Sequence, residues 1–330
     1  ENKQQKLFQA HDIDFKKHCK TLHPISMENL SNDSKRISYN YNNLKENMYS
    51  IIEKYKNSNG NYEFPNIEIP VAFHVIYPPG KENDIEFNIS DEIINKQLTV
   101  LNGINDEDPG FSMSLPGYKT SGYTKSGFHF YNYHPENKAY SRTENYQWFY
   151  KTESFEATIK DELCIEPEHV INVFYANAQG YLGWSYFPDD FLEDDKMHGI
   201  VINYQAILGG KLNPYNYGKT LLHEMGHYFG LYHTFQGGCN GEDGCNDTPS
   251  QNNGNNIFNC GEINSCPDKE GNDPYNNYMN YVDDNCMTRF TDEQIFRMWV
   301  YLETFKPTFL KKNIVPPDYS IYQVSLFKGW

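Results

Sequence analysis

The sequence predicts an α/β (α+β) fold, in which a layer of strands and helices is followed by an irregular, cysteine-rich region. Up to about residue 230, short β-branched apolar runs alternate with segments of helical periodicity. After Gly230 the composition changes to Asn, Gly, Asp and Cys, until a last helical stretch from about Thr291 to Phe305. The 330 residues, 38% of them hydrophobic, suffice for one large domain with an appended segment.

The expected elements can be placed in order from residue 69. The β-branched run from Ile69 to Tyr77 predicts the first strand. Ser90 is a preferred N-cap residue, and the apolar positions after it repeat at helical spacing. Further strands and one further helix are expected, the strands at 127–133, 170–176 and 199–203 and the helix around 153–163. This order predicts an upper lobe that ends near residue 230, and a lower lobe of residues 231–330.

Composition and cysteine usage indicate an exported protein. The net charge of −16 argues against nucleic-acid binding and favours the approach of basic peptides. No apolar run approaches the ~20 residues of a membrane span. The sequence starts without Met, as after removal of a secretory signal. Four of the seven cysteines lie in a polar region that can build little core, where disulfides stabilise most: Cys239, Cys260, Cys266 and Cys286. Secretion is therefore expected.

The most informative segment runs from His223 to His233 and reads HEMGHYFGLYH. On a helix, His223 and His227 project from one face and can bind one cation. Gly230 can adopt the left-handed conformation that ends a helix, which lets the chain turn and bring His233 back as a third ligand. Three neutral imidazoles are a zinc ligand set that leaves a fourth position open for water.

Glu224 lies beside this helix face and is the candidate general base. In open zinc sites the pKa of the bound water falls to about 7, and a carboxylate can take its proton and later pass it to a leaving amine. The alternative interpretation is a chance match on an ordinary amphipathic helix. Because Gly230 and His233 extend the His-Glu-x-x-His pattern, a chance match is rare. The segment predicts a zinc peptidase.

A second segment, Asn277–Met287, resembles the Met-turn of the metzincin zinc proteases in the form found in the pappalysin family. The resemblance also covers other segments and spans roughly residues 67–305. It implies a metzincin-type catalytic domain, with a mixed twisted sheet and the zinc helix in the upper lobe and a disulfide-rich lower lobe closed by a C-terminal helix. It also implies that Met279 forms a hydrophobic floor under the zinc ligands and that Tyr281 hydrogen-bonds the developing oxyanion. Without the family resemblance, Met279 would be interpreted as a core residue and Tyr281 as one of 27 tyrosines with no assigned role.

The same resemblance implies disulfides and a second metal ion. It pairs Cys239 with Cys266 and Cys260 with Cys286, a connectivity that spacing alone leaves open. A third bridge between Cys164 and Cys245 is a further hypothesis. The loop 241–248 has the oxygen-rich composition that Ca²⁺ prefers, and the family binds calcium there, so that Asp243 and Thr248 are the matched candidates. An acidic solvated loop is the alternative. Pappalysins commonly cleave before Lys or Arg, in agreement with the acidic net charge.

The remaining cysteine, Cys19, is the candidate latch of a latent form. Pro-forms of the pappalysin family carry a similar cysteine segment, which implies that the Cys19 thiolate closes the open zinc position. A disulfide to Cys164 or Cys245, or a surface thiol, is the alternative. Residues 1–60 are thus a candidate pro-segment that inhibits the catalytic domain of residues 61–330, and trimming is expected near Lys54 or Lys56.

These features together predict a secreted zinc endopeptidase, synthesised as a latent zymogen, that hydrolyses peptide bonds before Lys or Arg. One alternative is a catalytically silent binding or adhesion protein that retains the fold. Another is a zinc hydrolase that acts on something other than peptides. The intact base, oxyanion donor and three histidines count against a silent site.

Overall fold

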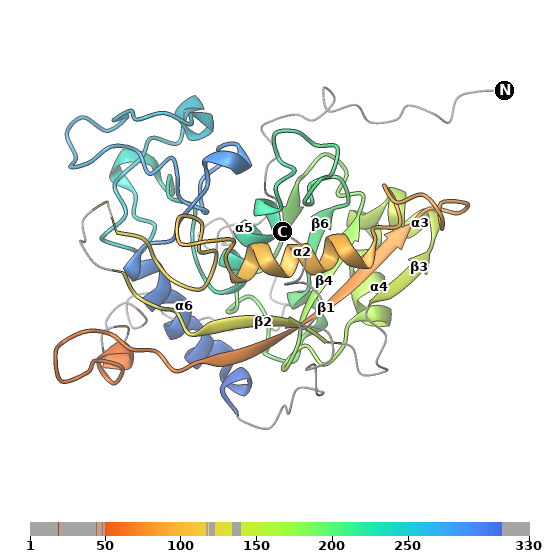
Figure 1. Ribbon diagram of the computed structural model, residues 1–330, viewed down its shortest axis with the longest axis horizontal. Helices are drawn as coiled ribbons and strands as arrows, with labels where there is room; N and C mark the ends of the chain where they lie inside the picture. Colours follow the sequence, from red (N-terminus) through yellow and green to blue (C-terminus); the bar gives the residue numbers. More distant parts are fainter. Residues whose placement is uncertain are drawn as a thin grey trace, which may run out of the picture.

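A six-stranded sheet organises the fold (Figure 1). The computed structural model describes Cys19, Leu44, Met48, residues 50–116, Tyr118, and residues 123–133 and 140–311. The strands are β1 (Ile67–Tyr77), β2 (Phe128–Asn132), β3 (Ser141–Glu144), β4 (Ile171–Ala176), β5 (Gly183–Trp184) and β6 (Ile200–Asn203). Their order is β2-β1-β4-β6-β5, and β3 also pairs with β1. All pairs are parallel except β5 with β6, so the predicted class and the mixed sheet are confirmed.

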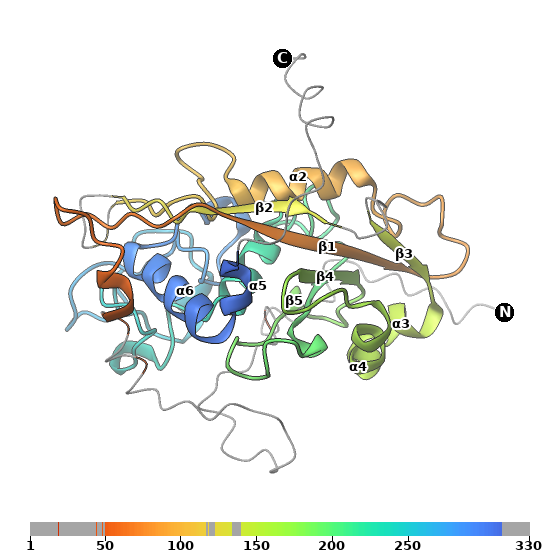
Figure 2. The same cartoon turned by 90° about the horizontal axis from the view of Figure 1, so that it is seen from below.

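Helices cover both faces of this sheet (Figure 2). Helix α2 lies on one side of β1 and β2, and α3, α4 and α6 lie on the other. The helices are α2 (Asp91–Asn102), α3 (Tyr146–Tyr150), α4 (Thr152–Leu163), α5 (Lys219–Tyr228) and α6 (Asp292–Phe305). The side chain of Ser90 accepts a hydrogen bond from the Ile93 N–H and caps α2, as its residue type predicts. A capping box of Thr291 and Gln294 starts α6.

The long elements expected from the sequence are confirmed to within a few residues, whereas three short ones were not expected. Strands β3 and β5 and helix α3 contain four, two and five residues. Segments of this length are too short to show a period of their own. Strand β5 nevertheless forms the antiparallel edge of the sheet, next to β6.

The apolar core extends from the sheet into residues that precede position 60. Leu44, Met48 and Ile52 are buried in the same cluster as β1, β4 and α6. Phe64 stacks on Trp299 of α6, with ring centroids 5.0 Å apart. Most of residues 1–60, and with them most of the expected helical stretches there, lie outside the described residues. A division of the chain at residue 60 stays a prediction.

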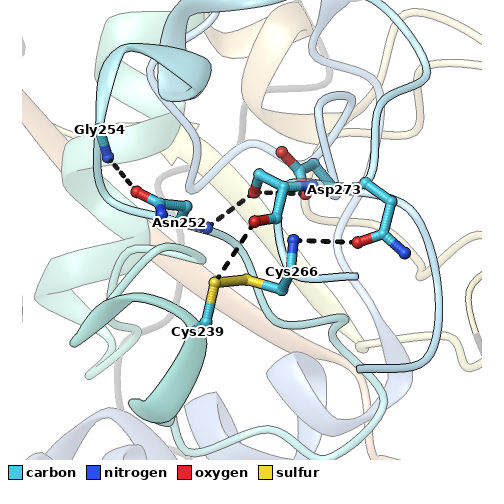
Figure 3. The surroundings of a disulfide bond; sticks show 7 residues. Cys239, Asn252, Gly254, Cys266 and Asp273 are labelled. Carbon is cyan, nitrogen blue, oxygen red and sulfur yellow. Dashed lines mark hydrogen bonds between the residues drawn. A yellow bond between two sulfur atoms is a disulfide. The ribbon is translucent and has the colours of Figure 1, made fainter. Parts of the chain in front are cut away.

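Regular structure is sparse after α5. Short 3-10 turns follow at η4 (Gly238–Asn240), η5 (Asn255–Phe258) and η6 (Asp284–Cys286). Two disulfides cross-link this region, Cys239–Cys266 and Cys260–Cys286, which are the pairs that the family resemblance implies. Around the first, Asn252 accepts from the Gly254 N–H (2.8 Å), and Asp273 is nearby (Figure 3).

The hypothesis of a third bridge between Cys164 and Cys245 is wrong. Neither cysteine belongs to a disulfide. Cys164 follows the end of α4, in the upper lobe, where burial raises the pKa of its thiol to about 12. Cys245 is buried in the acidic loop of the lower lobe, and burial raises its pKa well above the ordinary value. Cys164 is thus a partly buried thiol and Cys245 a buried one.

Candidate metal centre and active site

Helix α5 carries His223, Glu224 and His227 into the interior of the protein. Its first turn is capped from a distant segment, because Asp284 Oδ2 accepts from the backbone N–H groups of Tyr217 (2.9 Å) and Lys219 (3.2 Å). A carboxylate is favourable at the positive end of a helix. His223 and His227 then lie one turn apart, with ring centroids separated by 4.8 Å.

Gly230 ends α5 and redirects the chain. Its φ of +90° is a conformation that residues with a side chain rarely adopt. The Gly230 N–H donates to the His227 carbonyl (2.8 Å), and the Leu231 N–H donates to the Gly226 carbonyl (3.0 Å), which is the bonding of a Schellman motif. A Cβ at Gly230 would lie 2.3 Å from the ring of Tyr301. Only glycine fits this turn, which brings the following segment back toward α5.

The hydrogen bonds of two histidines fix which ring nitrogen faces the others. Nδ1 of His223 lies 2.8 Å from the carbonyl oxygen of Tyr278, and Nδ1 of His227 lies 2.7 Å from that of Leu231. A carbonyl only accepts, so each Nδ1 carries the proton and each Nε2 presents a lone pair. Nε2 of His227 lies 3.1 Å from Nε2 of His223 and 3.0 Å from Nε2 of His233. Facing lone pairs repel unless a cation lies between them, so this donor set fits a zinc ion.

Cys19 lies against the same three histidines. Its Sγ and one nitrogen of each ring all lie within 4.8 Å of one another. Its backbone forms an isolated parallel bridge with Gly183 of β5, and its Sγ lies 3.4 Å from Glu224 Oε2. The alternative of a disulfide to Cys164 or Cys245 is not realised, because Cys19 is in no disulfide.

Glu224 and Tyr281 both lie next to the three histidines, although Glu224 belongs to α5 and Tyr281 to the segment 277–287. Glu224 is 1% exposed. The ring centroid of Tyr281 lies 5.7 Å from that of His223 and 4.8 Å from that of His233. Burial, followed by the nearby Cys19 and Glu224, raises the pKa of the Tyr281 phenol well above its ordinary value. The phenol therefore stays protonated and can donate a hydrogen bond.

Met279 lies directly under the zinc helix. It is fully buried, and a Cβ at Gly226 would lie 2.4 Å from its Sδ. Glycine at this position, between the two histidines of α5, thus lets the Met-turn approach the helix backbone. The Met279 carbonyl also accepts from the Thr234 N–H (3.2 Å), next to His233. Gly226 was not among the residues predicted for the site, although glycine inside a helix is a signal of close packing.

A small, partly open cavity lies beside His223. Besides the cluster itself, its lining includes Leu182, Tyr215, Lys219, Thr220, Val282, Asp284 and Met287. Asp284 is 1% exposed, and burial raises the pKa of its carboxyl to about 7 although two N–H groups stabilise the charge. Burial lowers the pKa of Lys219, whose ammonium pairs with Asp108. The cavity therefore contains a titratable carboxyl and a cation that already has a partner.

The acidic loop after the zinc segment contains buried oxygens that lack protein donors. Among the described residues, Asp243 Oδ2, Asp247 Oδ1 and Thr248 Oγ1 have no hydrogen-bond partner. Burial raises the pKa of Asp243 to about 7 and that of Asp247 to about 6. Desolvated oxygens of this kind fit a hard cation such as Ca²⁺. Asp247 was not among the predicted calcium ligands, because the composition of the loop alone does not distinguish it from the other acidic residues.

The fold and the three converging imidazoles define the class of a zinc-dependent peptidase. A family model of the peptidase family M43, described as pregnancy-associated plasma protein-A, matches residues 155–303. An extracellular metalloprotease of Coccidioides posadasii is 34% identical to this chain, and the match covers 70% of this chain and 75% of that protein. One of Verticillium alfalfae is 33% identical, and the match covers 68% of this chain and 84% of that protein. One of Pyricularia oryzae is 36% identical, and the match covers 64% of this chain and 66% of that protein.

Solved structures agree with these sequence matches. Mature mirolysin of Tannerella forsythia, in complex with a cleaved peptide, is 25% identical with a TM-score of 0.59, and the match covers 74% of this chain and 98% of that one. A promirolysin mutant shares the fold at 22% identity and a TM-score of 0.64, over 89% of this chain and 96% of that one. The chain belongs to the M43, or pappalysin, family and is an extracellular metalloprotease. In the described part of the chain, no helix is long and apolar enough to cross a membrane.

Proposed function

We propose that this chain is a zinc endopeptidase that cleaves protein substrates before Lys or Arg and is latent while Cys19 lies on the metal site. The convergence of the Nε2 atoms of His223, His227 and His233 carries this proposal, because it fits a metal ligated by three histidines. A zinc ion bound there supplies a Lewis acid that polarises the peptide carbonyl and lowers the pKa of water. The complex of mirolysin with a cleaved peptide supports peptides as the substrate class.

Glu224 and Tyr281 would perform the proton transfer and the charge stabilisation. Glu224 takes a proton from the attacking water and returns it to the leaving amine nitrogen, as its burial next to His223 allows. Tyr281 donates a hydrogen bond to the carbonyl oxygen as that oxygen gains negative charge. Its raised pKa supports this assignment, because a donor must keep its proton throughout the reaction.

The latent state follows from two contacts of Cys19. Its Sγ lies with the three histidine nitrogens, where it would exclude water from the fourth ligand position. Its Sγ also lies 3.4 Å from Glu224 Oε2. While this contact persists, that oxygen would not be available to accept a proton from water. The thiol thus acts on both the metal site and the base.

The preference for a basic residue after the scissile bond is supported by the cavity. Asp284, a buried carboxyl in its lining, can bind a Lys or Arg side chain when ionised, and Lys219, the only Lys or Arg among the described residues that line the cavity, is paired with Asp108. For the second metal, the buried oxygens of Asp243, Asp247 and Thr248 support a structural Ca²⁺.

Cleavage of a denatured protein rich in Lys and Arg tests these assignments together. The full chain, its Cys19→Ala variant and a Cys19→Ala/Glu224→Ala variant would be compared after zinc loading, with product ends read by mass spectrometry. Full-length variants are preferable to a truncation at residue 61, because Leu44, Met48 and Ile52 belong to the core. We expect cleavage before basic residues by Cys19→Ala, with little cleavage by the other two. No cleavage by folded, zinc-loaded Cys19→Ala would favour a silent binding protein.

A further inference from the structure

The carboxylate of Glu224 lies between α5 and the residues that follow β5. Ser185 Oγ is 2.8 Å from the Glu224 carbonyl oxygen and 3.4 Å from its Oε2. Ser185 is 2% exposed, so its hydroxyl proton is available to protein acceptors rather than to bulk water. A hydroxyl has one proton to donate, and these two oxygens of a single residue compete for it.

The backbone around Ser185 is shaped to approach Glu224. At Gly183, a Cβ would lie 3.1 Å from Glu224 Cγ and 2.8 Å from the Val201 carbonyl oxygen. Ser185 directly follows β5, and both Ser185 and Gly183 lie against Glu224 of α5, whereas the Trp184 indole contacts Glu156 of α4. The absence of a side chain at Gly183 therefore brings the Ser185 hydroxyl within reach of the carboxylate.

A buried ion pair holds this short strand in place. The Trp184 indole N–H donates to Glu156 Oε1 (2.7 Å), which also accepts from Lys160 Nζ (2.7 Å). The Tyr186 hydroxyl donates to Glu156 Oε2 (3.1 Å). The residues on both sides of Ser185 are thus fixed to α4. A donor with fixed neighbours can restrict the orientation of the group that it binds.

We infer that Ser185 is a positioning residue for the general base: it holds the Glu224 carboxylate toward the three histidines once Cys19 has left. In the latent arrangement Oε2 contacts both Cys19 Sγ and Ser185 Oγ, each at 3.4 Å. Departure of the thiol removes one of these contacts and leaves the serine hydroxyl. The inference rests on the proposed role of Glu224 as base. A purely structural alternative is that Ser185 only bonds the α5 backbone carbonyl.

Kinetics of full-length variants distinguish these roles. In the zinc-loaded Cys19→Ala chain, we expect Ser185→Ala to lower kcat about ten- to hundredfold with little change in KM or zinc content, because small displacements of a reacting group have effects of this size. Ser185→Thr, which keeps the hydroxyl, should restore kcat to within a few fold. Ser126→Ala is the matched control, because it also removes a buried hydroxyl that donates to a backbone carbonyl, and Ser126 belongs neither to the histidine cluster nor to the cavity lining. It should leave kcat unchanged.

A double-mutant cycle and a crystal structure complete the test. In a Glu224→Asp background the effect of Ser185→Ala should largely disappear, because the shorter carboxylate no longer meets the hydroxyl. Crystals of zinc-loaded Cys19→Ala with and without Ser185→Ala provide a measure that is independent of activity. We expect one Glu224 conformer with the serine and several without it. An unchanged single conformer, or Ser185→Thr as impaired as Ser185→Ala, would overturn the inference. Absence of activity in the Cys19→Ala parent would instead contradict the proposed function.

Discussion

Replacing Asp284 by Asn is expected to stabilise the protein and to weaken its action on basic substrates. Asn keeps an oxygen that can accept the N–H groups of Tyr217 and Lys219, but removes the buried charge. Folding raises the pKa of this carboxyl from 3.8 to about 7. Well below pH 3.8 the carboxyl is protonated in both states and does not affect the free energy of unfolding. The destabilisation grows as the pH rises from 3.8 to about 7 and is complete well above pH 7, where the carboxyl is ionised in both states.

The magnitude follows from the pKa difference. The pKa of Asp284 is 3.8 in the unfolded chain and about 7 in the folded protein, and each pKa unit corresponds to about 1.4 kcal/mol. At pH 8, Asp284→Asn should therefore raise the free energy of unfolding by roughly 4 kcal/mol. Loss of one partner of a buried charge pair costs about 2 to 4 kcal/mol in binding, or roughly 30- to 1000-fold in kcat/KM. This loss should apply to peptides with Arg after the scissile bond and spare a matched peptide with Met there.

Two measurements check this trade-off. Urea unfolding at pH 5 and pH 8 gives the stability of Asp284→Asn, and kcat/KM on the Arg and Met peptides gives its specificity. Asp283→Asn is the matched control, because Asp283 is the neighbouring carboxyl but does not line the cavity. If Asp284→Asn unfolds at the same urea concentration as the parent at pH 8 and still prefers Arg, the reasoning is refuted.

Three further predictions concern the turn, the acidic loop and the N-terminal segment. Gly230→Ala should lose about 2 to 4 kcal/mol of unfolding free energy, measured with urea, and bind zinc more weakly, because its φ is +90° and its Cβ would meet Tyr301. A calcium-selective chelator should lower the thermal unfolding midpoint more at pH 8 than at pH 5. The pKa values of Asp243 and Asp247 are raised, so these carboxyls are ionised, and need Ca²⁺ to neutralise them, mainly at the higher pH. Equal shifts at the two pH values would contradict the calcium site. Terminal sequencing of the activated protein should place its start after Cys19 and before residue 44, because a cut near Lys54 would remove the buried Ile52.

The sequence was most informative where structure depends on local spacing. The positions of His223 and His227 follow from a separation of one helical turn, and the end of α5 follows from glycine at position 230. The long strands and helices were predictable for the same reason. Strand β4 is buried along its whole length, and five of its six residues are apolar or aromatic, with Asn172 as the exception, which marks it in a single sequence.

Features that depend on contacts between distant segments could not be predicted. Asp284 reaches the start of α5 across 65 residues, and Ser185 reaches Glu224 across 39. Nothing in the local sequence distinguishes these buried side chains from the carboxyls and hydroxyls that lie on the surface. The specificity pocket therefore had no assigned residue, and the hypothesis of a third disulfide failed because equal chemistry at Cys164 and Cys245 says nothing about their distance.

The parts of the chain that stabilise the fold and the parts that carry the chemistry differ in physical character. Apolar burial is concentrated in the sheet and α6, whereas three of the buried carboxyls with raised pKa, Asp243, Asp247 and Asp284, follow α5. A carboxyl of this kind opposes folding at neutral pH unless a cation neutralises it. The region that contains them has little regular structure, so the two disulfides would stabilise its fold and bound cations would neutralise its charge. Because this region has little regular structure, its sequence lacks helical or strand periodicity, and the lower lobe was recognised from its Asn, Gly, Asp and Cys composition instead.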